Sequence, residues 1–430
     1  MKSVRIYLTS YGISGAILSA LPVFLPLILL DRLSPAAYAS LLVVSGVVQM
    51  ILVPLLGTAT DRYGSAHVLI IGEGLYLANL LFACACVWSG YSSLVLWAVF
   101  YAASGAIGAL MMPAQATIVQ SMVPDEKLPR YLGVEQAIAV SGRLVGPSVA
   151  GAWMVVAGPS VGFLAVVSAW LVVWMIHIVI LYSMVMSEAV RKPDTAEVKG
   201  RLRAWGKEAF EGLLMRWKLR TERWLAFQTG IELLVIVPAF SMNLALTVKM
   251  LAWSNAWLGW LQASCGVGLV AANLTAEKMV DHLGAWRSAQ LGGYTCAAAM
   301  LGCAVSVSLS NPLATCLCVL IANYSLGIRI YCGRAQRRVA IPKEYLGRFA
   351  ASHVLINSLA AQFGNAIAAI VFSQFGAAAW YVMGSIGFVI VVALSSLIPD
   401  WRTLVSLKVD EARGYYARRH GNLLAPKTQE

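Results

Sequence analysis

Two nine-residue segments, VPDEKLPRY at residues 123–131 and IPKEYLGRF at residues 341–349, are variants of one pattern. Proline, glutamate, leucine and arginine match at a fixed offset, and the first and last positions carry similar side chains. A second match, DRYG at 61–64 and DHLG at 281–284, falls at nearly the same offset. Two matches in register predict that the chain consists of two similar halves with the same topology.

The composition predicts that both halves lie in a lipid bilayer. Of the 430 residues, 59% are hydrophobic and 12% are charged, whereas a soluble domain carries about 25% charged residues. The formal net charge of +12 would suggest nucleic acid in a soluble protein. Here the basic residues lie in loops beside apolar runs, which indicates contact with anionic lipid head groups and no nucleic-acid partner.

The apolar runs give the expected architecture, because a spanning helix needs about 20 mostly apolar residues. The spans expected in the first half are 7–30, 36–56, 68–88, 94–112, 132–156 and 161–184, and those in the second half are 224–247, 257–274, 289–309, 313–331, 349–372 and 379–398. The fold class is therefore an all-α membrane protein with about 12 transmembrane helices in two six-helix bundles related by pseudo-two-fold symmetry. The expected domains are 1–186, a linker at 187–223 with an amphipathic helix, 224–399, and a polar tail at 400–430.

Lysine and arginine are concentrated in the loops on one side of these spans, which predicts that this side and both termini are cytoplasmic. The first apolar run is too long for a signal peptide and is followed at once by further spans. The opposite loops are very short and offer little surface for a large partner. We expect a monomer in a plasma membrane or bacterial inner membrane.

The segment GTATDRYG at 57–64 resembles the signature loop of the major facilitator superfamily, G-x-x-x-D-R-x-G. The matching residues are Gly57, Asp61, Arg62 and Gly64. The second copy keeps Asp281 and Gly284 but departs from the pattern at the other two positions. The resemblance implies a major facilitator fold and a conformational latch, more firmly for the first half.

The fifth span carries Gly133, Gly142, Gly146, Pro147 and Gly151, a spacing that resembles the antiporter motif of drug:proton exporters in that superfamily. Glycines four apart let another helix approach closely, and proline bends a helix. The alternative interpretation is ordinary close packing, because glycine and proline are common in membrane helices. Within the superfamily the chain looks closest to the twelve-helix branch that includes macrolide and siderophore exporters. It lacks the arginine that the fourth helix of classical drug exporters usually carries.

Charged side chains inside the membrane are candidate functional residues, because each costs about 2.5–3.5 kcal/mol or more at the bilayer centre. Arg143 lies about 18 Å into the fifth span and Glu232 about 12 Å into the seventh. Burial favours the neutral form of a carboxyl group, which suits reversible protonation. Glu232 is therefore the first candidate for proton coupling, and the alternative is that it is a permanent counter-ion for Arg143. Arg143 could instead bind an anionic substrate.

Three further residues are weaker candidates for proton or substrate binding. Glu135 and His353 occupy equivalent positions in the two halves, and Glu73 lies in the third span. The alternative for each is a solvated position near the membrane surface. His177 and Arg329 fall near predicted helix ends and are assigned no function.

The sequence lacks a nucleotide-binding phosphate loop and the common hydrolase motifs. The eight cysteines lie in apolar stretches, without the spacing of a metal site. We therefore expect no enzyme activity, cofactor or metal. The predicted function is proton-coupled efflux of a small drug-like molecule or a secreted metabolite such as a siderophore. The alternatives are a substrate importer (symporter) on the same fold and a lipid-handling membrane protein.

Overall fold

The computed structural model describes residues 2–123, 128–189, 214, 216–332, 336–337, 340–341 and 346–419. Throughout these residues the regular secondary structure is helical, with no strand. Ten segments among them are long and apolar enough to cross a membrane. The prediction of an all-α membrane protein is confirmed.

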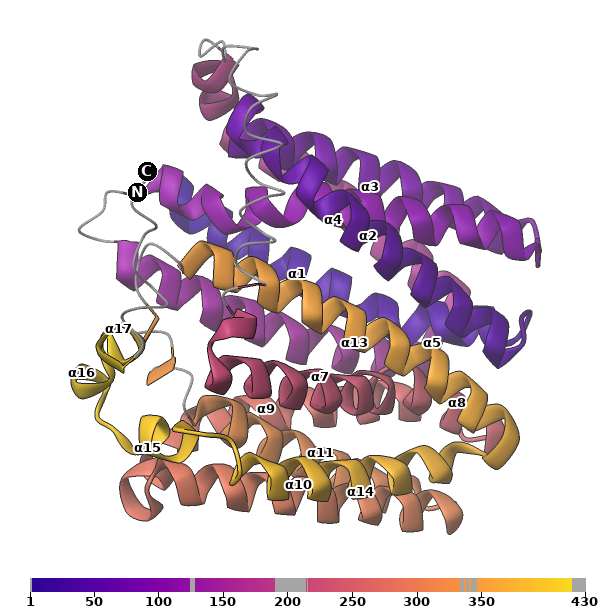
Figure 1. Ribbon diagram of the computed structural model, residues 1–430. Helices are drawn as coiled ribbons and strands as arrows, with labels where there is room; N and C mark the ends of the chain where they lie inside the picture. The colour runs from indigo at the N-terminus through magenta and orange to yellow at the C-terminus, as the bar shows by residue number, and fades with distance from the viewer. Residues whose placement is uncertain are drawn as a thin grey trace. The chain divides into compact units, whose positions relative to one another are not determined.

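The first half forms helices α1 Lys2–Leu30, α2 Pro35–Tyr63, α3 Ser65–Trp88, α4 Leu94–Met122 and α5 Leu128–Ala189 (Figure 1). Helix α5 contains both the fifth and the sixth predicted spans. They are separated at Gly158, whose φ of 73° and ψ of 176° are not helical. Glycine adopts a positive φ without the steric cost that a Cβ atom would bring.

The second half forms α7 Arg220–Phe240, α8 Met242–Met250, α9 Ala256–Leu283, α10 Ala285–Ser308, α11 Pro312–Tyr331, α13 Leu346–Phe375 and α14 Ala377–Ser395. The seventh span, expected as one helix, is divided into α7 and α8 at Ser241. Helix α9 corresponds to the eighth predicted span. It is not among the ten apolar segments, because polar residues such as Gln262 and Asn273 interrupt its apolar sequence.

The backbone repeats the pattern that the sequence motifs predict. Gly64 precedes α3 with φ 84° and ψ 153°, and Gly284 precedes α10 with φ 80° and ψ 150°. Gly376, which precedes α14, has φ 79° and ψ 177°, close to the values at Gly158. Equivalent loops of the two halves thus share one left-handed glycine conformation, as expected for a parallel repeat.

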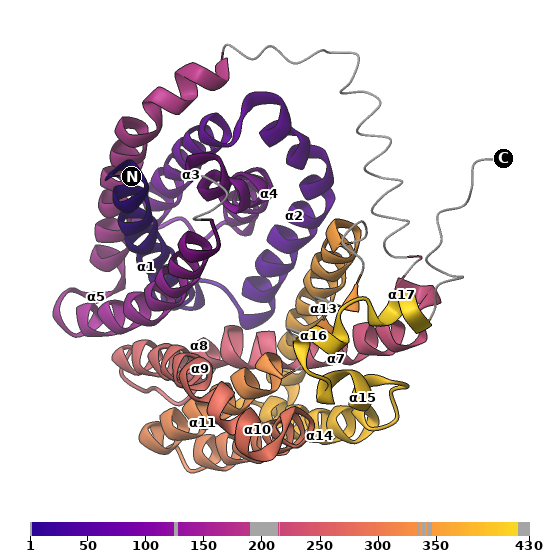
Figure 2. The ribbon, with the colours of Figure 1, turned by 90° about the vertical axis from the view of Figure 1, so that its left-hand side faces the viewer.

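By internal contacts the chain divides into two compact units. Unit 1 comprises Met1–Ala204, Phe240–Gly266 and Asn365–Gln374, and unit 2 comprises Trp205–Ala239, Val267–Gly364 and Phe375–Glu430. In unit 1, α1 packs along α5, α2 packs along α4, and α3 contacts both α4 and α5 (Figure 2). In unit 2, α10 packs against α11 and α14 (Figure 1). The domain limits drawn from the sequence stay a prediction.

Within unit 2, the end of α7 is held by a neighbouring helix. Pro238 has no N–H to donate to the carbonyl of Leu234. Gly364 of α13 lies directly against that carbonyl, since a Cβ atom there would be 2.2 Å from the Leu234 oxygen. Because residue 364 is glycine, α13 can approach the Leu234 carbonyl of α7 closely.

Helix α14 also binds the backbone of α7 near this proline. The indole N–H of Trp380 donates to the carbonyl of Val235 over 3.2 Å. The hydroxyl of Tyr381 donates to the carbonyl of Ala239 over the same distance. Both aromatic side chains are buried, so they fix α7 to α14 from inside unit 2.

The polar tail expected after residue 400 is partly folded. It forms α15 Trp401–Ser406, α16 Val409–Ala412 and α17 Tyr415–Arg419. Its apolar residues join others of unit 2 in one buried cluster, made of Leu219, Ala340, Ile341, Leu404, Ala412, Tyr415 and Tyr416. This part of the tail packs in the cluster because its tyrosine and leucine side chains supply an apolar face. The amphipathic helix expected in the linker lies mostly outside the described residues.

Candidate functional site

Glu232 of α7 forms an ion pair with Arg329 of α11 in unit 2. The Arg329 Nη2 lies 2.7 Å and its Nε 2.9 Å from the Glu232 Oε1. The amide of Gln228, one turn earlier on α7, donates to the same oxygen over 3.0 Å. The two charged side chains are only 12% and 7% exposed, so the pair is largely removed from solvent.

The third helix at this site, α10, contacts the guanidinium group of Arg329 through its backbone and through a glycine. Arg329 donates from Nη1 to the carbonyl of Ala289 over 3.2 Å. A Cβ atom on Gly293 would lie 3.2 Å from the same Nη1, and one on Gly292 would lie 2.7 Å from the carbonyl oxygen of Ser325. The two consecutive glycines thus let α11 approach α10 and bring Arg329 to Glu232.

The sequence analysis named Glu232 as the first candidate for proton coupling, with the alternative that it is a counter-ion for Arg143. It gave Arg329 no function. The structure pairs Glu232 with Arg329, which is only 8% exposed. A long side chain near a helix end can reach a neighbouring helix as readily as it can reach the interface. The side chains of Arg143, Glu135 and His353 lie outside the described residues.

Unit 1 contains a separate buried pair between α3 and α5. The His177 Nδ1 lies 2.7 Å and 2.8 Å from the two carboxylate oxygens of Glu73. Both residues are almost completely buried. The indole N–H of Trp170 donates to the backbone carbonyl of Glu73 over 3.2 Å. His177, which the sequence analysis left without a function, is therefore an interior residue.

The glycines of the motif on α5 pack against two other helices of unit 1. A Cβ on Gly146 would lie 2.1 Å from the carbonyl oxygen of Ala16 on α1, and Gly142 is similarly close to that helix. Further along, a Cβ on Gly151 would lie 2.8 Å from the Cα of Gly259 on α9. The motif therefore provides close helix contacts. The surroundings of Gly133 lie outside the described residues.

The two loop motifs are described in part. Gly64 and Gly284 occupy the positive-φ positions that start α3 and α10. Asp281 is exposed near the end of α9. The surroundings of Gly57, Asp61 and Arg62 lie outside the described residues, so the latch role of this loop stays a prediction.

A third buried charge cluster surrounds Glu222 at the start of α7. Arg337 binds both carboxylate oxygens, with its Nη2 2.6 Å from Oε2 and its Nε 3.0 Å from Oε1. The hydroxyl of Tyr416 donates to Oε1 over 2.9 Å, and the Nε of Arg216 lies 3.9 Å from Oε2. Burial alone would lower the pKa of Arg337, but the Glu222 carboxylate raises it overall. Burial and the negative charge of Glu222 raise the pKa of Tyr416 well above its usual value.

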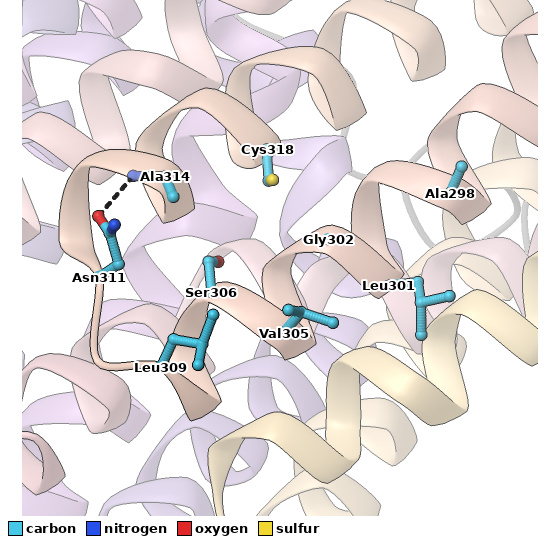
Figure 3. Close-up of a pocket in the computed structure, with 9 residues that line it drawn as sticks. All are labelled: Ala298, Leu301, Gly302, Val305, Ser306, Leu309, Asn311, Ala314 and Cys318. Atoms are coloured by element: carbon cyan, nitrogen blue, oxygen red, sulfur yellow. Dashed lines mark hydrogen bonds between the residues drawn. The ribbon is translucent and has the colours of Figure 1, made fainter.

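A pocket of about 410 Å³ lies between α10 and α11, away from these charges (Figure 3). One of its polar side chains, Asn311, accepts a hydrogen bond from the backbone N–H of Ala314 over 3.0 Å and so caps α11. The pocket is mainly apolar, and its lining consists of Ala298, Leu301, Gly302, Val305, Ser306, Leu309, Asn311, Ala314 and Cys318. No metal-binding cluster occurs among the described residues.

Residues 7–361 match the family described as the Major Facilitator Superfamily. The chain belongs to this superfamily. It is therefore a multi-pass membrane protein with the fold of a secondary transporter, whose substrates are small molecules. No curated protein matches the sequence.

Solved structures of other transporters share the fold at low sequence identity. A bacterial homologue of the iron transporter ferroportin, in an inward-facing state, is 13% identical with a TM-score of 0.70 and covers 91% of this chain and 99% of its own. A variant of the peptide transporter POT in complex with sulfate is 14% identical with a TM-score of 0.72, covering 92% and 95%. The nucleoside transporter NupG is 10% identical with a TM-score of 0.66, covering 95% and 100%. At these identities the likeness establishes the superfamily fold and leaves the branch open.

Proposed function

We propose that this superfamily member is a proton-coupled exporter of a small drug-like molecule or a secreted metabolite such as a siderophore. The observation that carries the proposal is the buried ion pair between Glu232 and Arg329. A carboxylate that accepts a proton inside a transporter gives the cycle a step that a proton gradient can drive.

Glu232 is placed so that a proton can compete with Arg329. In the described part of the chain, every hydrogen bond to its carboxylate ends on Oε1. A proton added at Oε2 neutralises the carboxylate and weakens its attraction to the guanidinium group. Arg329 is then free to bind an anionic or polar group of the substrate, and loss of the proton restores the ion pair.

The direction of transport is inferred from the glycine motif on α5. The contacts of Gly142 and Gly146 with α1 leave almost no space between the two helices. Such smooth helix surfaces can slide against each other without opening a leak. This property suits alternating access with outward transport, as the resemblance to exporters implies.

The proposed setting is a plasma membrane or bacterial inner membrane, with both termini cytoplasmic and the protein acting as a monomer. A membrane potential of 100 mV supplies about 2.3 kcal/mol for each charge moved, which corresponds to roughly a fifty-fold concentration ratio. One proton exchanged per substrate would therefore drive useful export.

Everted membrane vesicles provide the test. An inside-acid proton gradient is established, a panel of dyes, antibiotics and siderophores is added, and a pH-sensitive dye reports the gradient. We expect one class of compound to discharge the gradient in vesicles with the wild-type protein. Glu232→Gln should abolish this effect, whereas Glu277→Gln, at an exposed carboxylate in the same unit, should not.

Three results would contradict the proposal. Movement of radiolabelled compound without a change in the proton gradient would exclude proton coupling. Entry of the compound together with protons from the cytoplasmic side would identify a symporter. Transbilayer movement of labelled lipid, without movement of any compound in the panel, would instead identify a lipid-handling protein.

A further inference from the structure

The buried pair of Glu73 and His177 continues to a third side chain, Ser10 of α1. The Ser10 Oγ lies 2.7 Å from the His177 Nε2, on the side of the ring opposite Glu73. The same hydroxyl lies 2.8 Å from the backbone carbonyl of Tyr7. A serine, a histidine and a glutamate from three different helices thus form one chain of hydrogen bonds inside unit 1.

The orientation of the Ser10 hydroxyl and the number of hydrogens on the His177 ring depend on each other. The Ser10 hydroxyl has a single hydrogen. If it donates this hydrogen to the Tyr7 carbonyl, its oxygen accepts a hydrogen from the His177 Nε2. With Glu73 ionised, its carboxylate can only accept, so the Nδ1 of His177 donates to it; both ring nitrogens then carry hydrogen and the imidazole is positively charged. If Ser10 instead donates to Nε2, the ring is neutral.

We propose that Ser10, His177 and Glu73 form a proton-binding site, separate from the Glu232–Arg329 pair, in which His177 gains and loses one proton. The incoming proton binds Nε2 of His177, and the Ser10 hydroxyl turns to donate to the Tyr7 carbonyl. When the proton leaves Nε2 for solvent, the hydroxyl turns back to Nε2. The hydrogen on Nδ1 stays between His177 and Glu73 throughout.

The environment suits reversible binding of this kind. Burial disfavours a charged imidazole, whereas a carboxylate in contact favours it. Histidine is the side chain whose ordinary titration range includes neutral pH. Because Ser10, Glu73 and His177 belong to α1, α3 and α5, the bound proton also links three helices of unit 1.

Other titratable groups face this chain from the helices packed around it. The ring of Tyr7 lies 5.3 Å from that of His177, and the ring of Tyr11 lies 6.0 Å from that of Tyr7. On α3, Tyr76 packs against Trp170. The remaining titratable or charged side chains described on these three helices are Arg5 of α1, His67, Cys84 and Cys86 of α3, and Tyr182 of α5. Asp31 and Arg32 follow the end of α1, and Tyr63 is the last residue of α2.

The proposal can be tested by NMR without a substrate and without transport. The full-length protein is labelled with ¹⁵N-histidine and reconstituted in lipid nanodiscs, and ring-nitrogen signals are recorded between about pH 5 and pH 9. His177→Gln identifies the signals of His177 among the five histidines. If that variant does not fold, replacing His67, His282, His353 and His420 by glutamine leaves His177 as the sole labelled residue.

We expect both ring nitrogens of His177 to carry hydrogen at the acidic end of this range and only Nδ1 to carry it at the basic end. Glu73→Gln removes the charge that favours the imidazolium, and should leave His177 neutral throughout. Glu277→Gln should not alter the signals. An unchanged His177 signal across the range, or loss of hydrogen from Nδ1 instead of Nε2, would overturn the proposal. Since no transport is measured, either result is independent of whether export is proton-coupled.

Discussion

Gly151 of α5 and Gly259 of α9 touch through their backbones. A Cβ atom on Gly259 would lie 2.1 Å from the Cα of Gly151, and one on Gly151 would lie 2.8 Å from the Cα of Gly259. The carbonyl of Pro147 would lie only 3.0 Å from the Cβ on Gly259. The backbones of α5 and α9 are in direct contact here, and this contact requires glycine at both positions.

Gly259→Ala is therefore expected to destabilise the protein. The added methyl group has no space and must push α9 away from α5, at a cost of about 1–3 kcal/mol. Thermal unfolding of the purified protein in detergent measures the effect. Gly230→Ala is the matched control, because the nearest atom to its Cβ is a side-chain methyl 3.8 Å away. Equal melting temperatures for the two variants would contradict the close contact.

Gly364→Ala is expected to separate α13 from α7. Its Cβ would lie 2.2 Å from the carbonyl oxygen of Leu234, next to the proline that leaves this carbonyl without its helical donor. A loss of about 1–3 kcal/mol follows from the overpacking. Gly387→Ala, whose Cβ would make an ordinary contact of 3.5 Å with Val235, should change stability much less. A Gly364→Ala variant as stable as this control would contradict the described packing.

Arg329→Gln is expected to be more damaging than the loss of one hydrogen bond. It leaves the Glu232 charge buried without its partner, and breaking such a pair typically costs 3–5 kcal/mol. The double variant Glu232→Gln with Arg329→Gln removes both charges and should recover much of that stability. Chemical unfolding of the three variants measures this coupling. Additive effects of the two substitutions would mean that the residues do not interact.

Tyr416→Phe is expected to remove a hydrogen bond to the buried Glu222 carboxylate and to cost about 1.5–3 kcal/mol. The pKa of Tyr416 is raised above its usual value of 10.0, first by burial and then by the charge of Glu222. A tyrosine with a raised pKa stabilises the folded state below pH 10 and loses this contribution as pH rises further.

The difference in unfolding free energy between wild type and Tyr416→Phe should therefore shrink as pH rises above 10. Denaturant unfolding at neutral pH and at successive alkaline pH values measures it. A difference that stays constant would show that Tyr416 does not donate to Glu222.

The sequence was sufficient to predict the repeat and the helices, because apolar runs and loop glycines are local features. Gly64 and Gly284 could be matched from four-residue motifs, and both have the same backbone conformation. Side-chain partners were harder to predict. The sequence analysis placed Arg329 and His177 near helix ends by counting residues. Whether such a residue contacts lipid or a carboxylate depends on which helices are neighbours, and a residue count does not provide this.

The folded part of the tail shows the same difficulty. Tyr415 and Tyr416 lie in a stretch that the sequence analysis described only as a polar tail, yet they belong to one buried cluster with Leu219 and Ile341. Their burial depends on a surface assembled from the linker, a loop and the chain end. A single sequence contains no local signal for such a surface.

The central claim is that Glu232 carries the coupled proton, and a comparison of two transport modes tests it most directly. Proteoliposomes receive a compound that the vesicle panel identifies, and both gradient-driven transport and substrate exchange without a gradient are measured. We predict that Glu232→Gln, which cannot release a proton, abolishes gradient-driven transport but retains exchange. Gradient-driven transport at the wild-type rate in Glu232→Gln would contradict the account.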